Sequence, residues 1–413
     1  MVEGAHHWHR LLGVPLAPAD FRARSSDLHL HMRTLAGLLL EAGRTDEAFV
    51  AFETGRALGY AVDVDSGFFS RVVQRNPFPA DGGCIDLGHL QRVQERLRAG
   101  EAAVVLAVVP PRLAAFVVGS DSVRCVAVDA VMSRDCFIAL DSGAKMVPHL
   151  LAKDAGLSAV PKALLGLAQG IVGEVGKRTV VGFVPFDSLH MVPWRAVLRE
   201  CGLPWDQLAF PTGFSSLLWH GQGRALVTEG IALGHGEAAA LDLKDEARRF
   251  ATAFGGRGRF VENCTAGEIR QALGGNAAVL LSCHGSTRHA PGTPRLVLEL
   301  GDGPTRAEDV FPERVSAPVV LLSACDSGVY HMAWSDYPVG AAPDLLRRGA
   351  GAVICARFPI RAAFAGECFP RFGSRLAEGV AVEAAFAQVL QEMECEGADR
   401  WRDLACLELL KAN

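Results

Sequence analysis

The sequence has no block of basic residues and no pair of cysteines with CxxC spacing. Proteins that bind nucleic acid through its phosphates usually carry a basic stripe, whereas this 413-residue chain has a formal net charge of -5. The charge distribution therefore argues against nucleic acid as a direct partner. The missing CxxC pairs exclude a zinc site of the ribbon type.

Long apolar runs and targeting signals are also missing. The most apolar stretch, Ala102 to Val109, is followed by two prolines and Arg112, which is too soon for it to span a bilayer. The N-terminal residues lack the basic and then apolar pattern of a signal peptide. The cysteines are odd in number, and a chain of this size does not need disulfides to hold a core, so we expect free thiols. These absences predict a soluble cytoplasmic protein without a membrane partner.

Residues 1–62 predict a short helical segment. Leu35, Leu38 and Leu39 recur at helical spacing, and a second apolar stripe begins at Ala48. This helix pair resembles a tetratricopeptide unit in the placement of its small residues. Repeats bury their cores against neighbouring repeats, so one unit cannot form a solenoid. We interpret it as a cap or remnant, with a docking face for a partner as the alternative.

The rest of the chain divides into two further parts. A glycine- and proline-rich stretch at residues 76–83 marks a boundary. Mixed helical and strand-like patterns follow it, and from about residue 178 strands and helices alternate regularly. We therefore predict a helical segment at 1–62, a mixed α/β part at 63–224 and a catalytic part at 225–413.

Continuous apolar segments and helical patterns alternate in the C-terminal half. The apolar segments are residues 179–186, Ala225–Gly234, Ala277–Gly285, Pro318–Cys325 and Gly349–Phe358. The helical patterns are Ala238–Ala253, Ala266–Leu273, Ala341–Arg348 and Phe364–Leu376. Apolar strands separated by helices predict an α/β fold with a mostly parallel sheet covered on both faces. Chemistry in such sheets gathers just beyond the carboxyl ends of the strands.

Two of these segments end in reactive residues. One delivers His284, followed by Gly285, and the other delivers Cys325, followed by Asp326. If the two strands are neighbours, an imidazole and a thiol project into the same crevice, and the imidazole can take the thiol proton. The N–H groups of Gly285 and Cys325 are candidates for an oxyanion hole. A lone cysteine at a strand end is more often buried and inert, so the pairing of the two strand ends carries the argument.

Several segments resemble the CHAT family of caspase-like peptidases, which is related to separase and the caspases. The segments SCHG and LLSACDSG match that family's HG and SAC-[DE]-[ST]-G motifs. Val184–Leu198 is similar to its block around P-W-x-A-L, and Phe210–Trp219 lies where the family has P-[ST]-x-x-x-L. The resemblance spans roughly residues 85 to 395, with the motifs in the family's order.

The resemblance implies a caspase-like α/β/α sandwich that cleaves a peptide bond through an acyl-enzyme. Carried over residue by residue, it makes His284 the base and Cys325 the nucleophile, with Gly285 and the Cys325 backbone holding the oxyanion. Relatives act in bacteria as proteases that a sensor switches on, often in antiviral defence or regulated cell death. The implied partners are therefore a protein substrate and an activating sensor protein.

Departures from the family pattern affect the substrate pocket more than the dyad. Gly234–Gly236 replaces a usual Asn-Pro, and Ser323 stands where related metacaspases have an acid that faces the P1 pocket. The P1 preference therefore stays open. Candidate pocket residues are Asp187, His235, Asp326 and Asp336, each with a solvated turn or surface position as the simpler interpretation.

The sequence gives no basis for a cofactor. His6, His7 and His9 resemble a metal-binding cluster, but a frayed terminus is the simpler interpretation, so we assign no metal. Gly234 and Gly236 follow a strand but lack the rest of a nucleotide fingerprint.

Two other functions stay open beside a regulated endopeptidase. One is a catalytically silent CHAT scaffold that binds protein partners, although a pseudoenzyme has no need to keep both dyad residues and their glycines. The other is a transferase that uses the same acyl-cysteine chemistry.

Overall fold

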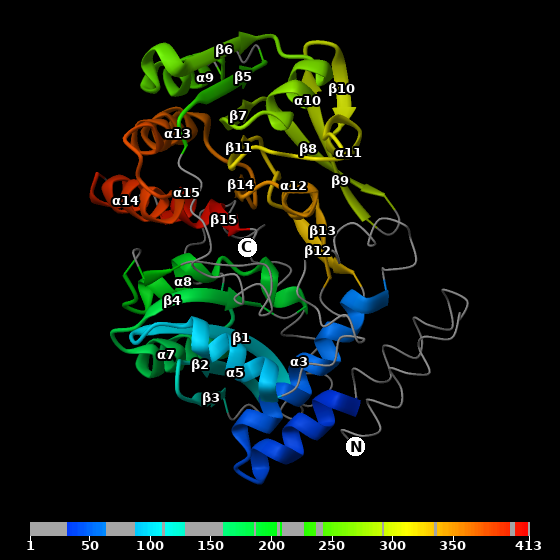
Figure 1. Cartoon of the computed structure of the whole chain (residues 1–413), viewed down its shortest axis with the longest axis vertical. Coiled ribbons are helices and arrows are strands. Elements are labelled where there is room, and N and C mark those ends of the chain that lie inside the picture. Colours follow the sequence, from blue (N-terminus) through cyan, green and yellow to red (C-terminus); the bar gives the residue numbers. More distant parts are fainter. Residues whose placement is uncertain are drawn as a thin grey trace.

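The computed structural model describes residues 31–62, 87–109, 112–128, 160–185, 187–204, 207–208, 227–236, 243–290, 293–333, 337–396 and 401–411. A six-stranded sheet and a four-stranded sheet organise these residues, and they lie one above the other in Figure 1. Within these ranges no helix is long and apolar enough to cross a membrane.

The six-stranded sheet has the strand order β15-β14-β11-β7-β5-β6. Its strands are β5 (Gly230–Gly234), β6 (Gly258–Glu262), β7 (Ala278–Ser282), β11 (Val319–Ser323), β14 (Ala352–Ala356) and β15 (Leu407–Lys411). Neighbouring strands run parallel, except that β15 pairs with β14 in the antiparallel direction. The apolar segments predicted from residue 225 onward are therefore adjacent strands of one sheet.

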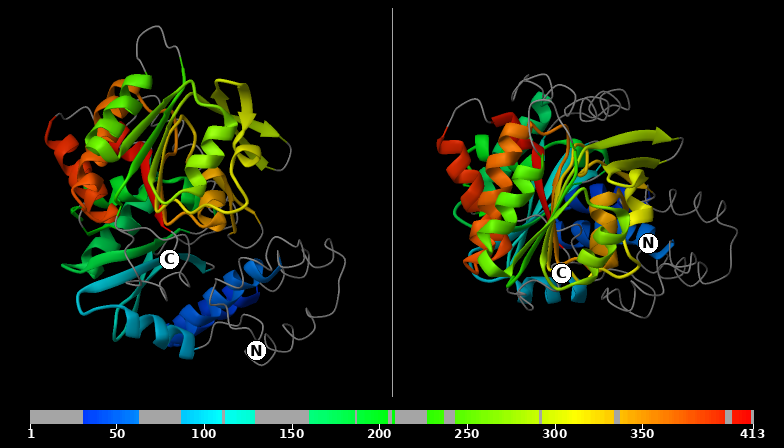
Figure 2. Two further views of the ribbon diagram at one scale, coloured as in Figure 1. Left: turned by 45° about the horizontal axis from the view of Figure 1, so that its top comes forward. Right: turned by 90° about the horizontal axis from the view of Figure 1, so that it is seen from above.

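Helices cover both faces of this sheet (Figure 2). The helices of the first face are α9 (Leu243–Ala253) and α13 (Ala362–Ala377), with α14 (Val382–Cys395) packed on α13, and those of the second are α10 (Ala266–Gly274) and α12 (Ala341–Arg348). Alternate residues of each strand enter two different cores, so Leu280 lies in the first and Leu281 in the second. The predicted α/β/α sandwich with a mostly parallel sheet is confirmed.

Local signals set the start of α10. The Thr265 hydroxyl accepts a hydrogen bond from the Glu268 N–H, and the Glu268 carboxylate accepts one from the Thr265 N–H at 2.8 Å. This reciprocal pair satisfies two N–H groups that have no partner within the helix. The helix therefore begins at Ala266, as the sequence predicts.

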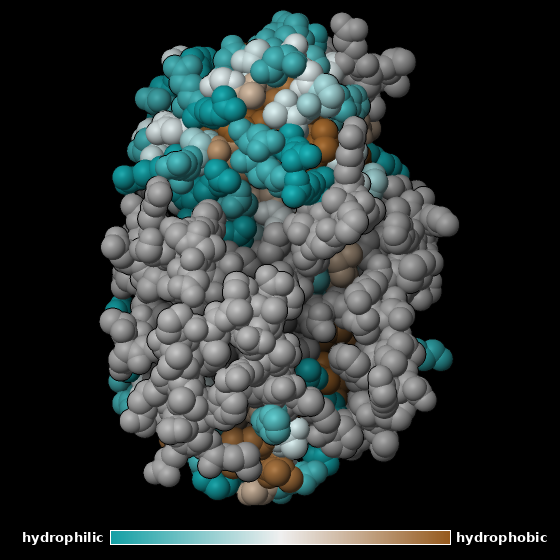
Figure 3. All heavy atoms as spheres, turned by 90° about the vertical axis from the view of Figure 1, so that its right-hand side faces the viewer, coloured by the Kyte–Doolittle hydropathy of each residue, from teal (hydrophilic) through white to brown (hydrophobic). Residues whose placement is uncertain are grey.

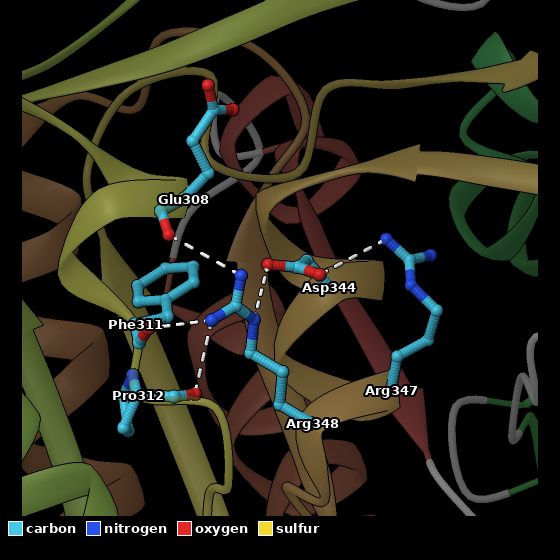
Figure 4. Close-up of polar contacts among 6 residues, drawn as sticks. All are labelled: Glu308, Phe311, Pro312, Asp344, Arg347 and Arg348. Carbon is cyan, nitrogen blue, oxygen red and sulfur yellow. Dashed lines mark hydrogen bonds and ion pairs between the residues drawn. The ribbon is translucent and has the colours of Figure 1, made fainter. Parts of the chain in front are cut away.

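Arg348, at the end of α12, fastens this helix to the chain that precedes β11 (Figure 4). Its guanidinium donates to the carbonyl oxygens of Phe311 at 2.7 Å and Pro312 at 3.2 Å, and to the Asp344 carboxylate at 2.8 Å. These bonds use the fork of donors that only arginine offers. They hold the helix that leads into β14.

The four-stranded sheet has the order β3-β2-β1-β4. Its strands are β1 (Glu101–Val109), β2 (Arg112–Val118), β3 (Val123–Val128) and β4 (Thr179–Val184), and the helices around it are α3 (Thr45–Val62), α5 (Leu87–Arg96), α7 (Lys162–Val175) and α8 (Trp194–Glu200). The prediction placed residues 179–186 in one parallel sheet with the later apolar segments. The structure instead pairs β4 with β1. The prediction failed here because a local apolar pattern does not specify the partner strand.

The N-terminal helices cover this second sheet. Residues 31–41 form one helix, and α3 is the other. The Phe49 and Phe52 rings of α3 lie 5.4 Å and 6.1 Å from the Phe116 ring of β2, and Arg33 donates to the Val108 carbonyl oxygen at 2.7 Å. The pair therefore belongs to the core of the N-terminal half, and its tetratricopeptide identity stays a prediction. Residues 1–30, including His6, His7 and His9, lie outside the described residues.

Two excursions that the sequence did not predict leave the six-stranded sheet beside its carboxyl edge. Their strands are β8 (Gly285–Ala290), β9 (Thr293–Leu300), β10 (Gly303–Arg306), β12 (Tyr330–Ala333) and β13 (Tyr337–Gly340). The remaining short helices are η3 (Asp187–Met191), η6 (Gly255–Arg257), α11 (Ala307–Val310) and α15 (Trp401–Cys406). The hairpin β12–β13 contacts both β9 and η3, so it links the two halves of the chain next to the strand ends.

The face in Figure 3 carries mostly hydrophilic side chains over the end of the molecule that holds the six-stranded sheet. Among the described residues, the large apolar side chains that stay exposed are Leu38 and Leu87.

Candidate active site

The register of β7 and β11 brings the two predicted catalytic residues to the same level. Ser282 pairs with Ser323 in this parallel ladder, and His284 and Cys325 each follow two residues later. The ladder extends one step past the strands, because the Cys283 N–H donates to the Ser323 carbonyl oxygen at 3.3 Å. Both residues therefore leave adjoining strands at one edge of one sheet.

Strand alternation sends both side chains to the same face. The Ser282 hydroxyl donates to the Leu243 carbonyl oxygen of α9, and Ser323 follows Leu321 of the first core by two positions. Residues two positions further along a strand point the same way. Gly236 supports this placement, because a Cβ added there would lie 3.3 Å from His284 Cδ2 and 2.9 Å from the Leu243 side chain of α9. His284 is exposed and Cys325 is partly buried.

Gly285 brings the loops of the two residues into contact. A Cβ added at Gly285 would lie only 2.6 Å from the Cys325 carbonyl oxygen and 3.0 Å from the Ala324 Cβ. Only glycine fits between the two segments. The glycine of the His-Gly pair thus has a packing role against the protein's own backbone, in addition to any role toward a substrate.

The turn after Cys325 is anchored to β14. Asp326 has a φ of 59°, which reverses the chain directly after the cysteine. The buried Ser327 hydroxyl donates to the Leu322 carbonyl oxygen at 3.1 Å and accepts from the Ala356 N–H at 3.0 Å. The Gly328 N–H adds a bond of 2.7 Å to the Ala356 carbonyl oxygen. The residues after the cysteine thus hold its backbone in place.

The surroundings of the Cys325 thiol favour its protonated form. Burial raises the pKa of this thiol, and the neighbouring Asp326 raises it further. A main-chain hydrogen bond from Ile360, in the loop after β14, acts in the opposite direction and lowers the pKa. Because burial is the largest effect, Cys325 needs a base to become a nucleophile at neutral pH.

The other cysteines near the sheet are unsuited to this role. Burial raises the pKa of the Cys283 and Cys355 thiols well above the ordinary value, and that of Cys264 to about 12. Cys283 lies in the core beside α10, as the alternation of strand residues predicts. Every cysteine in the described residues is a free thiol.

The candidate pocket residues have different outcomes. His235 follows β5, and its N–H donates to the Ser282 carbonyl oxygen at 2.9 Å. Its side chain is partly buried, and strand alternation directs it to the face opposite His284. Asp326 directly follows the candidate nucleophile. The Asp187 backbone lies in η3, but its side chain is not among the described ones. Asp336 lies outside the described residues. The structure therefore brings Asp326 to the dyad and leaves the pocket assignment a prediction.

Sequence reasoning missed Glu246, a buried acid on the first face. Its side chain is 3% exposed, and burial raises the pKa of its carboxyl to about 8, while the Ser323 and Ser282 hydroxyls lower it. The signal was present in the sequence, because Glu246 lies on the helical stripe of Leu243, Ala247 and Phe250. No group of three or more potential metal ligands occurs within the described residues.

The part of the chain that holds the six-stranded sheet is similar to a known family. The family model of the CHAT domain matches residues 222–401, which include β5 to β14 and both predicted catalytic residues, whereas the resembling blocks upstream lie outside the match. No curated protein matches the sequence.

Among solved structures, a separase complex shares the fold of this chain. The separase–securin complex of Saccharomyces cerevisiae matches with a TM-score of 0.51 and 9% identity, over 93% of this chain and 36% of that chain. The complex of Porphyromonas gingivalis RgpB pro- and mature domains matches with a TM-score of 0.41 and 12% identity, over 68% of this chain and 77% of that chain. The chain thus spans about a third of the separase chain, and identities this low show the fold alone.

Proposed function

The chain carries a CHAT domain at residues 222–401, and from this premise we propose that it is a cysteine endopeptidase. Cys325 is the nucleophile and His284 is the general base. The observation that carries the proposal is the shared level of the two residues past the Ser282–Ser323 pair, on one face of one sheet. The contact of Gly285 with the Cys325 carbonyl supports it, because this contact holds the two loops together.

The reaction begins with proton transfer. His284 takes the thiol proton as the sulfur attacks the scissile carbonyl carbon, and a tetrahedral oxyanion forms. The N–H groups of Gly285 and Cys325 donate hydrogen bonds to that oxyanion. His284 then gives its proton to the leaving amine, and the acyl group stays on Cys325. His284 next takes a proton from water, whose oxygen attacks the acyl carbon, and the thiol is released with that proton.

The substrate is a protein, and its cleavage is regulated. A similar solved structure is a separase–securin complex, which supports a protein partner for this chain as well. We place the activity in a bacterial defence or cell-death pathway that a sensor protein switches on, in the cytoplasm. The pocket candidates Asp187, His235, Asp326 and Asp336 would contact the substrate.

A peptide-library assay tests the proposal. We expect Cys325→Ala to abolish cleavage and His284→Ala to lower the rate by about 10²–10⁴-fold, because the base is lost while binding remains. Cys395→Ala is the matched control, since Cys395 is an exposed thiol on α14 away from the strand ends, and it should cleave normally.

A peptidyl electrophile separates catalysis from a scaffold role. A peptidase forms an adduct on Cys325 that is lost in Cys325→Ala. If the wild-type protein stays unlabelled even after its partner has activated it, and if its biological effect survives Cys325→Ala, the protein is instead the silent scaffold.

A further inference from the structure

Glu246 lies directly beneath the candidate dyad. It belongs to the buried stripe of α9, the helix on the face to which His284 and Cys325 project. The hydroxyls of Ser323 and Ser282 lie close enough to lower the pKa of its carboxyl, although neither carboxyl oxygen has a hydrogen-bond partner among the described residues. These serines stand two residues before the nucleophile and two residues before the base. One carboxyl group therefore faces both strands of the site.

The hydrogen bonds of Ser282 limit how it can meet this carboxyl. Its hydroxyl donates to the Leu243 carbonyl oxygen at 3.1 Å, and a hydroxyl has only one hydrogen to give. Ser282 therefore offers lone pairs to Glu246. An ionised carboxylate also offers only lone pairs, so a favourable contact requires a proton on Glu246. Ser323 still has its own hydrogen and can donate to the other carboxyl oxygen.

The charges around Glu246 favour the same protonation state. Burial raises the pKa of this carboxyl to about 8, and Arg249 on its own helix is the charged side chain that opposes the shift. Cys283, which directly follows the strand β7 that packs against α9, points to the opposite face of the sheet and lies in the core beside α10. Neither carboxyl oxygen has a close hydrogen bond with the described residues, so an ionised form would be poorly compensated.

We propose that Glu246 is a positioning residue whose protonated carboxyl joins Ser282 to Ser323 and so sets the spacing of His284 and Cys325. In the protonated state the carboxyl O–H can donate to Ser282 and the carbonyl oxygen can accept from Ser323, which would give both unpartnered oxygens a hydrogen bond. This assigns a role to the serine in each of the segments S-C-H and S-A-C, which the dyad chemistry does not use. The catalytic part of this inference rests on the proposed function, whereas its structural part rests on the buried position of Glu246 beside Ser282 and Ser323.

Unfolding by urea tests the protonated state without any activity measurement. The folded state keeps a proton that the unfolded state loses above the ordinary pKa of 4.5. The folding equilibrium constant of the wild type relative to Glu246→Gln should therefore fall about tenfold per pH unit from about pH 5 to about pH 8, and level off above that. Glu262→Gln, at an exposed acid on β6, is the control and should show no such slope. A flat ratio for Glu246→Gln would overturn the proposal.

Alkylation of Cys325 tests the positioning role. Glutamine keeps a donor and an acceptor, so Glu246→Gln should react with iodoacetamide within about threefold of the wild type, as judged by mass mapping of the Cys325 peptide. Glu246→Leu keeps the volume without hydrogen bonds and should react at least about tenfold more slowly well below its unfolding midpoint. Equal rates in the two variants would overturn the role.

These outcomes are separable from those of the peptidase proposal. If Glu246→Leu does not fold, Ser323→Ala replaces it, because that change removes one end of the contact at little cost in volume. If the pH slope and the difference in alkylation rate are found in a protein that cleaves no peptide, the peptidase proposal is refuted and the Glu246 proposal stands. If peptides are cleaved but neither effect is found, the Glu246 proposal is refuted and the peptidase proposal stands.

Discussion

Cys325 depends on its neighbours for reactivity, because its own thiol is not acidic. Burial and the adjacent Asp326 raise its pKa, and the hydrogen bond from Ile360 offsets only part of that increase. A thiol of this kind reacts quickly only when a base stands within reach during the attack. The placement of His284 is therefore the residue-level feature on which the proposed reaction depends.

Gly285→Ala is expected to lower peptide cleavage by at least about 100-fold, because the added Cβ would force the Cys325 carbonyl to move and a small displacement at a catalytic centre is costly. The measurement is the cleavage rate of a library-derived peptide. Gly173→Ala in α7 is the control, since no atom lies within 4 Å of its added Cβ. That change should keep full activity and stabilise the fold by about 0.5–1 kcal/mol. Equal activity of the two variants would show that the Gly285 contact is unimportant.

The positions of His284 and Cys325 in the fold were predictable from the sequence, whereas the position of Glu246 was not. Both residues follow an apolar strand by two positions, so their level along the sheet follows from the strand pattern. Glu246 was visible only as a charged residue on an apolar helical stripe. Whether such a residue faces solvent or strand ends depends on how the helix docks, which no local pattern specifies.

At the scale of elements, the sequence predicts what is apolar and regular. The predicted segments Pro318–Cys325 and Ala341–Arg348 contain β11 and coincide with α12. The short strands β8, β10 and β15 were missed, because GSTRHA and GPTR are polar and LELLK also fits a helix. The partners of these strands are set by tertiary contacts, which a local sequence pattern does not specify. For the same reason β4 was grouped with the wrong sheet.

Arg348 is the element-level contact with the clearest expected cost. Arg348→Ala leaves the carbonyls of Phe311 and Pro312 without their donor, and we expect a loss of about 2–4 kcal/mol in the free energy of unfolding. Arg348→Lys should recover only part of it, because an ammonium cannot reproduce the fork of bonds. The measurement is urea denaturation, with the exposed Arg314→Ala as a control that changes stability by less than about 0.5 kcal/mol. A loss no larger than that of the control would mean that this contact adds nothing to α12.

At the scale of the whole molecule, one hydrophobic core joins the two large sheets. A single cluster of buried residues includes Val105 of β1 and Leu280 of β7. Phe386 of α14 lies at the junction, with the Arg195 guanidinium of α8 4.4 Å from its ring centre and the Phe372 ring stacked at 5.6 Å. The matched CHAT region begins at residue 222. Residues that precede it therefore contribute to the same hydrophobic core.

This shared core predicts that the two halves unfold together. Two of the chain's own cysteines report on it, Cys125 in β3 of one sheet and Cys355 in β14 of the other. Under pulsed alkylation in rising urea, both should become reactive at the same midpoint, as a cooperative transition requires. Phe386→Ala, which removes a buried ring at the junction, should lower both midpoints equally, with a cost of about 3–5 kcal/mol, whereas the exposed Leu87→Ala should shift neither. If Phe386→Ala moved only the Cys355 midpoint, the halves would be independent domains, and the N-terminal half would be an attachment to the CHAT region.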